Sequence, residues 1–333
     1  MEKNKNLFEE FSAGNKSDWQ ARAAKENKIA DPLKALSFRH VEGIAQAPYY
    51  DQDDVKNTIP GFTSSGDAVY GARAWYNMPY IAAKEFREVN TAALTALQQG
   101  ADGVLIDCAG TQQIDTAWLN DIELPYCRLA FLAENEAAFQ PLMAMPAINA
   151  ICFYKGPQAK ISLPKEKLEG LKMAGIVLNA ENRLHELKSA LALSKQYLAQ
   201  LMAQGLSADE AALEIAFLFT LSTDFFKDIA FLRSLRRLFY TQAKELGCKN
   251  FKAHDLWIQA LNPNNKIEAL EPHSNMLLGT TASIAAAIGH ADGISLQAEK
   301  PIGMEARIAC NVSNILREES RLHKVADPAA GAY

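Results

Sequence analysis

The stretch IAFLRSLRRLFY, residues 229–240, preceded by Phe225 and Phe226, decides the fold of this chain. Its apolar residues at positions 232, 235, 238 and 239 recur at helical spacing, which predicts a helix with one buried face. Five further motifs follow in order: NMLLGTT at 275–281, GISLQ at 293–297, ARIACN at 306–311, EES at 318–320 and VADPAAG at 325–331. No other region of the sequence combines so many distinctive motifs.

This ordered set resembles the substrate-barrel domain of the methylmalonyl-CoA mutase family. The resemblance departs slightly in the last motif, where Ala330 replaces the first of two family glycines. It implies an α/β fold, a TIM-type (β/α)8 barrel, here with clipped outer helices and an N-terminal helical extension. The motifs identify the family but do not by themselves make this member catalytic.

Composition narrows the class of protein independently of that resemblance. Of the 333 residues, 49% are hydrophobic and 22% are charged, which is ordinary for a globular protein with a large core. The net charge of -5 argues against nucleic-acid binding. No apolar run is long enough to span a membrane, and the charged start MEKNKNLFEEF does not look like a signal peptide. Five scattered cysteines without a CxxC pair predict reduced thiols and a cytoplasmic location.

From residue 85 onward helices and strands alternate, which predicts a parallel α/β structure. A first helix should end at Gly100, and a helical region over residues 184–221 should break at Ser207, which begins a capping box with Glu210. Residues 60–80 read as loop. Strands are expected at 103–107, 127–132, 150–154, 175–179, around 252–259 and at 293–297.

The sequence is expected to divide into an extension at residues 1–70 and a barrel at residues 71–333, with no cobalamin-binding domain. A helix beginning near Ser17 and Trp19, an EGI turn and the acidic pair Asp53 and Asp54 are similar to the start of the family's small, non-catalytic chain. In that family the extension reaches over a partner subunit, so the resemblance implies a docking arm. The alternative is an arm packed on its own domain.

Polar residues close several of the expected strands. Ligands in barrels of this type are handled at the carboxyl ends of the strands, so these residues are candidate substrate-binding groups. They are Asp107, Glu134, Lys155, Asn179, Gln259, Gln297 and Glu299, with Lys300 beside the last. The alternative role for any of them is to cap a helix or reach solvent.

The family resemblance also implies which chemistry this chain lacks. Family members use adenosylcobalamin, with a cobalt-ligating histidine in a DxHxxG motif, and none of the six histidines here has that context. His290 resembles a surface residue of a turn before a strand. We therefore expect this chain to bind no cofactor and no metal, and to contribute no catalytic residue.

Two further positions weaken a catalytic role. Gln259 lies near the place of a family histidine, and an amide cannot act as an acid near neutral pH. Leu278 replaces a family arginine and cannot pair with a phosphate or carboxylate. The tyrosine that follows Trp75 in catalytic members has no clear counterpart in Tyr76 or Tyr80.

Charged residues of the C-terminal motifs suggest two surfaces. Arg233, Arg236 and Arg237 could share one face of their helix and meet the phosphates of CoA or an acidic partner, although a solvated face is the simpler expectation. Asp327 and Glu319 could supply structural ion pairs. No Walker A, GxGxxG, GxSxG or HExxH motif offers a competing activity.

Three hypotheses follow from the sequence. The first is a small subunit that supports the large catalytic subunit of an isomerase, in a heterodimer. The second is a stand-alone acyl-CoA-binding barrel, with a homodimer as the fallback assembly. The third is a fragment of a longer mutase subunit.

Overall fold

The computed structural model describes residues 14–41, 44–55, 72–73, 75–82, 86–108, 111, 113–145, 148–157, 161–163, 170–179, 182–262 and 274–329. The chain divides into two compact units, residues 62–330 and residues 1–61 with 331–333. Parts of the expected extension and of the loop over residues 60–80 therefore lie outside the described residues. Within the described part, no helix is both long and apolar enough to cross a membrane.

The larger unit is built on a nine-stranded sheet whose neighbouring strands all pair in parallel. The order of strands in the sheet is β3-β11-β10-β9-β8-β7-β6-β5-β4. From β4 to β11, each strand therefore pairs with the strand that follows it in the sequence. The bounds are β3 Tyr76–Asn77, β4 Tyr80–Ala82, β5 Gly103–Asp107, β6 Arg128–Ala133, β7 Ala150–Tyr154, β8 Leu171–Leu178, β9 Ile215–Thr220, β10 Trp257–Asn262 and β11 Gly293–Leu296.

The sheet closes on itself through residues 76–82. β3 pairs with β11, while β4 pairs with β5, and a single bridge joins Tyr80 to Gln297 across the seam. Pro79 has no N–H to donate and separates the two short strands, but its carbonyl still accepts from the N–H of Leu105. Counting β3 and β4 as one broken strand, the wall has eight members, as a (β/α)8 barrel requires. The expected fold class is confirmed.

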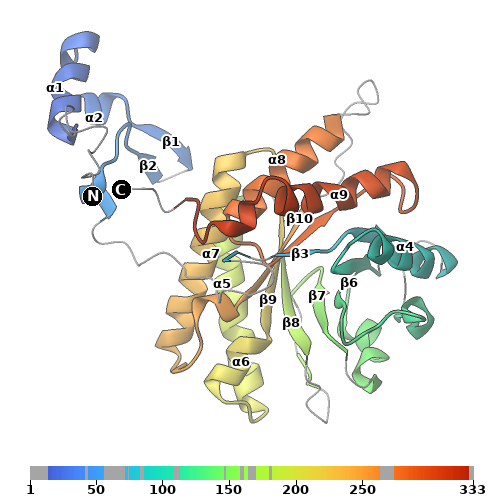
Figure 1. Ribbon diagram of the computed structural model, residues 1–333. Helices are drawn as coiled ribbons and strands as arrows, with labels where there is room; N and C mark the ends of the chain where they lie inside the picture. The colour runs from blue at the N-terminus through green and yellow to red at the C-terminus, as the bar shows by residue number, and fades with distance from the viewer. Residues whose placement is uncertain are drawn as a thin grey trace, which may run out of the picture. The chain divides into compact units, whose positions relative to one another are not determined.

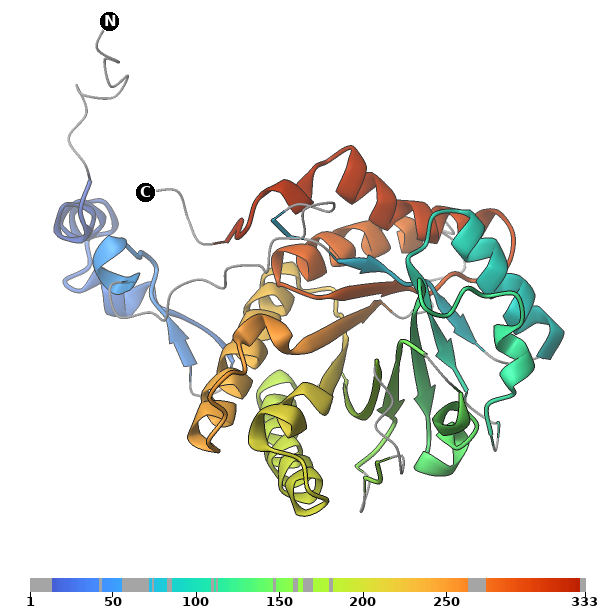
Figure 2. The same ribbon diagram turned by 60° about the horizontal axis from the view of Figure 1, so that its bottom comes forward.

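The outer helices lie around this sheet in Figure 1 and Figure 2. They are α4 Phe86–Gln98, α5 Arg183–Ala203, α6 Ala208–Glu214, α7 Phe225–Glu245, α8 Ser274–Ile288 and α9 Met304–Glu318. Among the described residues between β5 and β7, the connections hold only short 3-10 turns, at Thr116–Leu119, Glu136–Phe139 and Leu142–Ala144. The described connections there are shorter than in a full barrel, so the expected clipping is confirmed.

Local signals explain most helix boundaries. α7 begins after Asp224, whose side chain accepts from the backbone of Lys227, and it covers the whole predicted helix. Ser207 and Glu210 form the expected capping box at the start of α6. Gly100 follows α4 with φ of +90°, a conformation that glycine adopts without strain.

Two expected assignments were wrong. Residues 215–220 were expected to be helical, but IAFLFT forms β9, because a run of aromatic and β-branched residues suits a strand buried on both faces. Residues 60–80 were expected to be loop, yet residues 76–77 form β3 and residue 80 begins β4. Two- and three-residue strands interrupted by proline carry too short a pattern to be recognised from the sequence.

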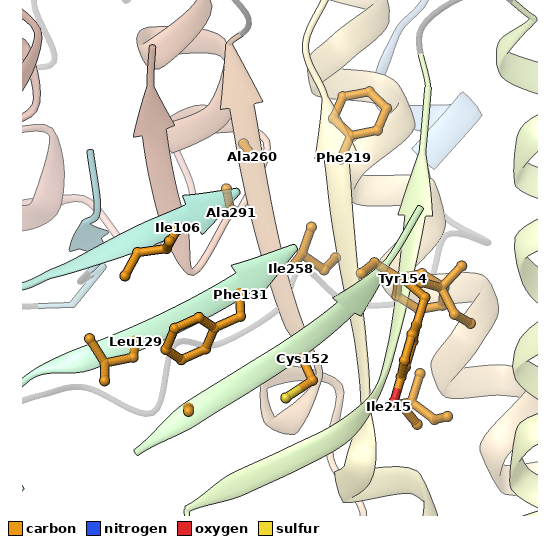
Figure 3. Close-up of a cluster of buried hydrophobic side chains, with 14 of the residues drawn as sticks. Ile106, Leu129, Phe131, Cys152, Tyr154, Ile215, Phe219, Ile258, Ala260 and Ala291 are labelled. Carbon is orange, nitrogen blue, oxygen red and sulfur yellow. The ribbon is translucent and has the colours of Figure 1, made fainter. Parts of the chain in front are cut away.

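Alternation of side chains along the strands produces two apolar layers. One faces the helices and includes Phe131, Tyr154 and Ile258, which Figure 3 shows beside their neighbours on adjacent strands. The other fills the barrel interior, which we call the lumen. Its buried members are Met78, Leu105, Ala130, Leu132, Ile151, Phe153, Ala216, Leu218, Trp257 and Leu261.

The smaller unit contains α1 Lys16–Asn27, α2 Pro32–Ala35, the antiparallel hairpin of β1 Phe38–Val41 and β2 Ile44–Gln46, and α3 Gln52–Val55. α1 begins slightly earlier than expected, with Asn15 as the N-cap. Among the described residues of this unit only Ala23 and Pro32 are buried. Its own described contacts therefore provide very little apolar core.

Candidate functional site

The carboxyl ends of the barrel strands bring mostly polar side chains to one rim, which we call the mouth. Every second side chain along a barrel strand faces the lumen, and each of these residues lies two positions beyond such a side chain. The strand geometry therefore directs each of them inward. The mouth comprises Tyr80, Asp107, Glu134, Lys155, Asn179, Thr220, Leu261 and Gln297, one from each member of the wall.

A charged cluster occupies one half of the mouth. The Tyr80 hydroxyl donates to Asp107 Oδ2 at 2.6 Å. Lys155 Nζ lies 2.9 Å from Asp107 Oδ1 and 3.8 Å from Glu134 Oε1. Asp107 is the last residue of β5, and Tyr80 is the first of β4. Glu134 and Lys155 directly follow β6 and β7, so four neighbouring parts of the wall contribute to a single polar group. Three of the residues predicted from the sequence are thus brought together.

The electrostatics of this cluster favour internal pairing. Burial, followed by the hydrogen bond to Asp107, raises the pKa of Tyr80, so the hydroxyl stays protonated. Burial also raises the pKa of the neighbouring Cys108 thiol to about 12, which makes it a poor nucleophile. Two carboxylates surround one ammonium group, so the cluster carries a net negative charge.

The sequence predicted Gln259 at the carboxyl end of a strand, but this residue does not lie at the mouth. Residues 253–255 form a 3-10 turn, so β10 starts only at Trp257 and runs to Asn262. Gln259 therefore sits inside the lumen with no exposed surface. Its Oε1 accepts from Trp257 Nε1 at 3.3 Å, and its Nε2 donates to Ser295 Oγ at 2.8 Å.

The lumen around Gln259 is tightly packed. Ser295 Oγ in turn donates a hydrogen bond to the Met78 carbonyl at 2.5 Å. At Gly293 an added Cβ would lie 3.1 Å from the indole of Trp257 and 3.3 Å from the Gln259 amide carbon. Glycine is needed there because the large side chains of β10 press against the backbone of β11.

The remaining candidates stay apart from the charged cluster. Asn179 follows β8 and is exposed, while its carbonyl accepts from Arg183 at 3.5 Å. Gln297 is half-buried at the seam of the barrel, and its N–H donates to the Asn262 carbonyl. Glu299 and Lys300 lie beyond the end of β11 and are exposed.

His290 was expected at the surface, and this was wrong. It does occupy a turn, with φ of +71°, but it is only 3% exposed. Its Nε2 lies 3.4 Å from Asp327 Oδ1. Burial, together with the nearby positive charge of Arg73, lowers the pKa of His290 to about 3, so the imidazole is neutral.

Neither the ligand-binding face nor the simpler solvated face considered for the arginines of α7 is found at Arg236. Arg236 is 2% exposed, and its guanidinium binds Asp292 at 2.5 Å and three backbone carbonyls. Arg233 pairs with Asp327, which confirms the structural role expected of that aspartate. These two arginines fasten α7 to neighbouring segments and do not form a surface for phosphates.

The motif around Leu278 is built into α8. Thr280 and Thr281 lie in the middle of α8 and donate to the carbonyls of Met276 and Leu277 one turn earlier. Leu278 itself is half-buried in the same helix.

Sequence reasoning missed Tyr80 as a member of the mouth. Of the two tyrosines after Trp75, Tyr80 reaches the mouth, whereas Tyr76 lies on β3 near the opposite end, with its ring 5.5 Å from that of Trp257. The signal that could have found it is its position five residues after a buried tryptophan that leads into the first strand.

The described residues offer no evident place for a metal or for cobalt. No group of three His, Cys, Asp or Glu side chains among them is arranged to hold a metal ion. The eight mouth residues include no imidazole, the cobalt ligand that the family resemblance implies. The described part of the mouth therefore does not fit a histidine-ligated cobalamin.

Sequence comparisons with known proteins point to one family. Residues 131–333 match the family model described as methylmalonyl-CoA mutase. The "Methylmalonyl-CoA mutase small subunit" of Propionibacterium freudenreichii subsp. shermanii is 32% identical and aligns with 93% of this chain and 55% of the relative. The protein of the same name from Porphyromonas gingivalis is 26% identical over 98% of this chain and 60% of the relative.

"Methylmalonyl-CoA mutase" of Escherichia coli is 27% identical over 96% of this chain and 55% of the relative. The chain thus spans little more than half the length of these three relatives. The family model covers more than half of the chain, and the matched region contains all the sequence motifs between residues 225 and 331. The chain belongs to the methylmalonyl-CoA mutase family.

Proposed function

We propose that this chain is a small-subunit-like member of the family, which supports a catalytic partner in the adenosylcobalamin-dependent isomerisation of methylmalonyl-CoA and succinyl-CoA. Two of the relatives that align with nearly its whole length are named small subunits. The observation that carries the proposal is the state of the lumen at Gln259, where a polar group is used for internal hydrogen bonds.

A packed lumen opposes catalysis in this chain. Met78, Phe153 and Leu218 are fully buried, and the amide of Gln259 is held between Trp257 and Ser295. A binding site for a thioester needs hydrogen-bond donors that point into open space. Here the donors of the lumen point into packed protein, which is the arrangement of a structural core.

The negative charge of the mouth is a second argument against substrate binding in this chain. An acyl group that bears a carboxylate would meet Asp107 and Glu134, with Lys155 as the nearby cation. That ammonium already pairs with Asp107 at 2.9 Å, so a new anion would have to compete for it. We therefore assign substrate binding and the cobalamin to the partner chain.

The smaller unit is a natural docking arm in this scheme. Phe38 and Ile44 of its hairpin are 57% and 53% exposed. A two-stranded hairpin is marginally stable by itself in water, so another surface is needed to cover it. A partner subunit would provide that surface, with the arm contributing to a heterodimer.

Co-expression with a mutase large chain from the same genome tests the proposal. We expect the two chains to co-purify, and the pair to isomerise methylmalonyl-CoA with added adenosylcobalamin while this chain alone does not. Replacing Phe38 and Ile44 by serine should weaken co-purification, whereas Tyr126→Ser, a control at a residue 85% exposed on the other unit, should not. Activity of this chain alone would overturn the assignment.

The gathering of Tyr80, Asp107, Glu134 and Lys155 favours a second candidate, a stand-alone acyl-CoA-binding barrel that forms a homodimer. Titration calorimetry with CoA and acyl-CoA esters separates the two proposals. Heat of binding that disappears in both Asp107→Asn and Lys155→Met would favour this candidate. Absence of heat in the wild-type chain would exclude it.

A further inference from the structure

Arg128 crosses the barrel at the end opposite the mouth. It opens β6, and its guanidinium carbon lies 4.7 Å from the ring centroid of Trp257 on β10. In the closed order of the sheet, β6 and β10 are separated by the same number of strands in either direction, so they face each other across the axis. The arginine therefore spans the diameter of the barrel.

Two more parts of the wall hold the same guanidinium. The ring of Tyr76 on β3 lies 5.4 Å from the guanidinium carbon. Nη1 donates to the side-chain oxygen of Asn149, just before β7. Three other segments of the wall thus converge on this one side chain of β6 at the N-terminal end of the axis.

The charge of Arg128 has an unusual environment. Among the described residues no carboxylate forms an ion pair with it, and its Nε is buried without a hydrogen-bond partner. Burial lowers its pKa, which reflects the cost of removing the cation from water. The faces of Trp257 and Tyr76 offset part of that cost through cation–π attraction.

We propose that Arg128 is a plug that closes the N-terminal end of the barrel axis. Its flat guanidinium covers the indole of Trp257, which is itself only 7% exposed, and it shields the Gln259–Ser295 chain of hydrogen bonds from water. This role explains why a cation whose desolvation is unfavourable occupies this position. A long apolar side chain could cover the indole equally well, but it would have no polar group to face the solvent.

Acrylamide quenching of Trp257 fluorescence tests the plug. The signal is isolated by subtracting spectra of a Trp257→Phe variant. Arg128→Ala should raise the quenching constant several-fold with an unchanged circular dichroism spectrum, since a cavity of guanidinium shape then admits small molecules. Arg307→Ala, at an exposed arginine of α9, is the matched control and should leave quenching unchanged.

Chemical rescue separates a plug from a general loosening of the fold. A low concentration of guanidinium chloride should lower quenching and raise the melting temperature of Arg128→Ala, because the ion occupies the vacated place over the indole. Sodium chloride at equal ionic strength should not. Unchanged quenching in a folded Arg128→Ala protein, or no difference between the two salts, would overturn the proposal.

If the alanine variant does not fold, Arg128→Lys supplies the same test. A lysine keeps the charge but cannot lie flat over the indole while donating to Asn149. It should raise quenching, and a constant equal to that of wild type would contradict the plug. None of these outcomes depends on whether a catalytic partner binds.

Discussion

Arg233 and Asp327, 94 positions apart, are joined by two parallel hydrogen bonds of 2.6 and 2.9 Å. The pair ties the segment after α9 to the middle of α7. It therefore brings two distant motifs of the sequence into direct contact. The same carboxylate lies 3.4 Å from His290 and accepts from the N–H of Ala329.

Removing this pair should destabilise the barrel. Asp327→Asn leaves Arg233 without its carboxylate, and we expect a loss of about 2 kcal/mol in the free energy of unfolding. Urea denaturation measures the change. Glu319→Gln, at an exposed acid of the neighbouring motif, is the control and should change stability by less than about 0.5 kcal/mol. Equal effects in both variants would count against a structural role for Asp327.

Stability should fall in acid because of His290. Burial and Arg73 lower its pKa from 6.5 to about 3, so between these values the unfolded chain binds a proton that the folded chain does not. The contribution of the neutral imidazole is complete above pH 6.5 and is lost progressively as the pH falls toward 3. Burial opposes ionisation of Asp327, but the bonds from Arg233 outweigh it and lower the pKa of that carboxyl, which adds a loss in the same direction at lower pH.

His290→Asn isolates this effect, because asparagine tolerates the positive φ of the turn and does not titrate. The variant should show a flatter dependence of unfolding free energy on pH over that window. Identical slopes for variant and wild type would show that another group is responsible.

Gln259 should behave as a structural residue. Gln259→Leu removes the partner of Trp257 Nε1 and of Ser295 Oγ, and leaving buried polar groups unpaired costs about 1 to 3 kcal/mol. Thermal unfolding provides the measurement. Gln140→Leu, at an exposed glutamine, should be close to neutral. A Gln259→Leu protein as stable as wild type would mean that the lumen is more open than its packing indicates.

Asp107 and Lys155 should be energetically coupled. A double-mutant cycle of Asp107→Asn and Lys155→Met measures their interaction, which we expect at about 1 to 2 kcal/mol because both groups are mostly buried. The pair Glu134 and Lys155, 3.8 Å apart with Glu134 63% exposed, should be coupled by less than about 1 kcal/mol. Zero coupling of the first pair would show that this ion pair does not hold the mouth cluster together.

Much of the barrel could be predicted from the sequence. Residues 103–107 and 150–154 form strands with the expected bounds, because short apolar runs between turn residues are typical of buried parallel strands. β9 was missed because it follows α6 directly, without an intervening turn residue. β3 and β4 were missed because each is too short to show a period.

The candidate site was predictable only in part. The rule that strand ends meet at one rim found Asp107, Glu134 and Lys155. Tyr80 was missed because residues 76–80 were expected to be loop, whereas residues 76–82 close the barrel. His290 and Arg236 were misplaced because their burial comes from segments far away in the sequence, which local patterns do not record.

Sedimentation velocity of this chain mixed with a mutase large chain from the same genome tests the central claim most directly. A supporting subunit predicts a single species with the mass of a one-to-one complex, and loss of that species when Phe38 and Ile44 are replaced by serine. Separate boundaries for the two chains at all concentrations, with this chain sedimenting as a monomer or a homodimer, would contradict the claim.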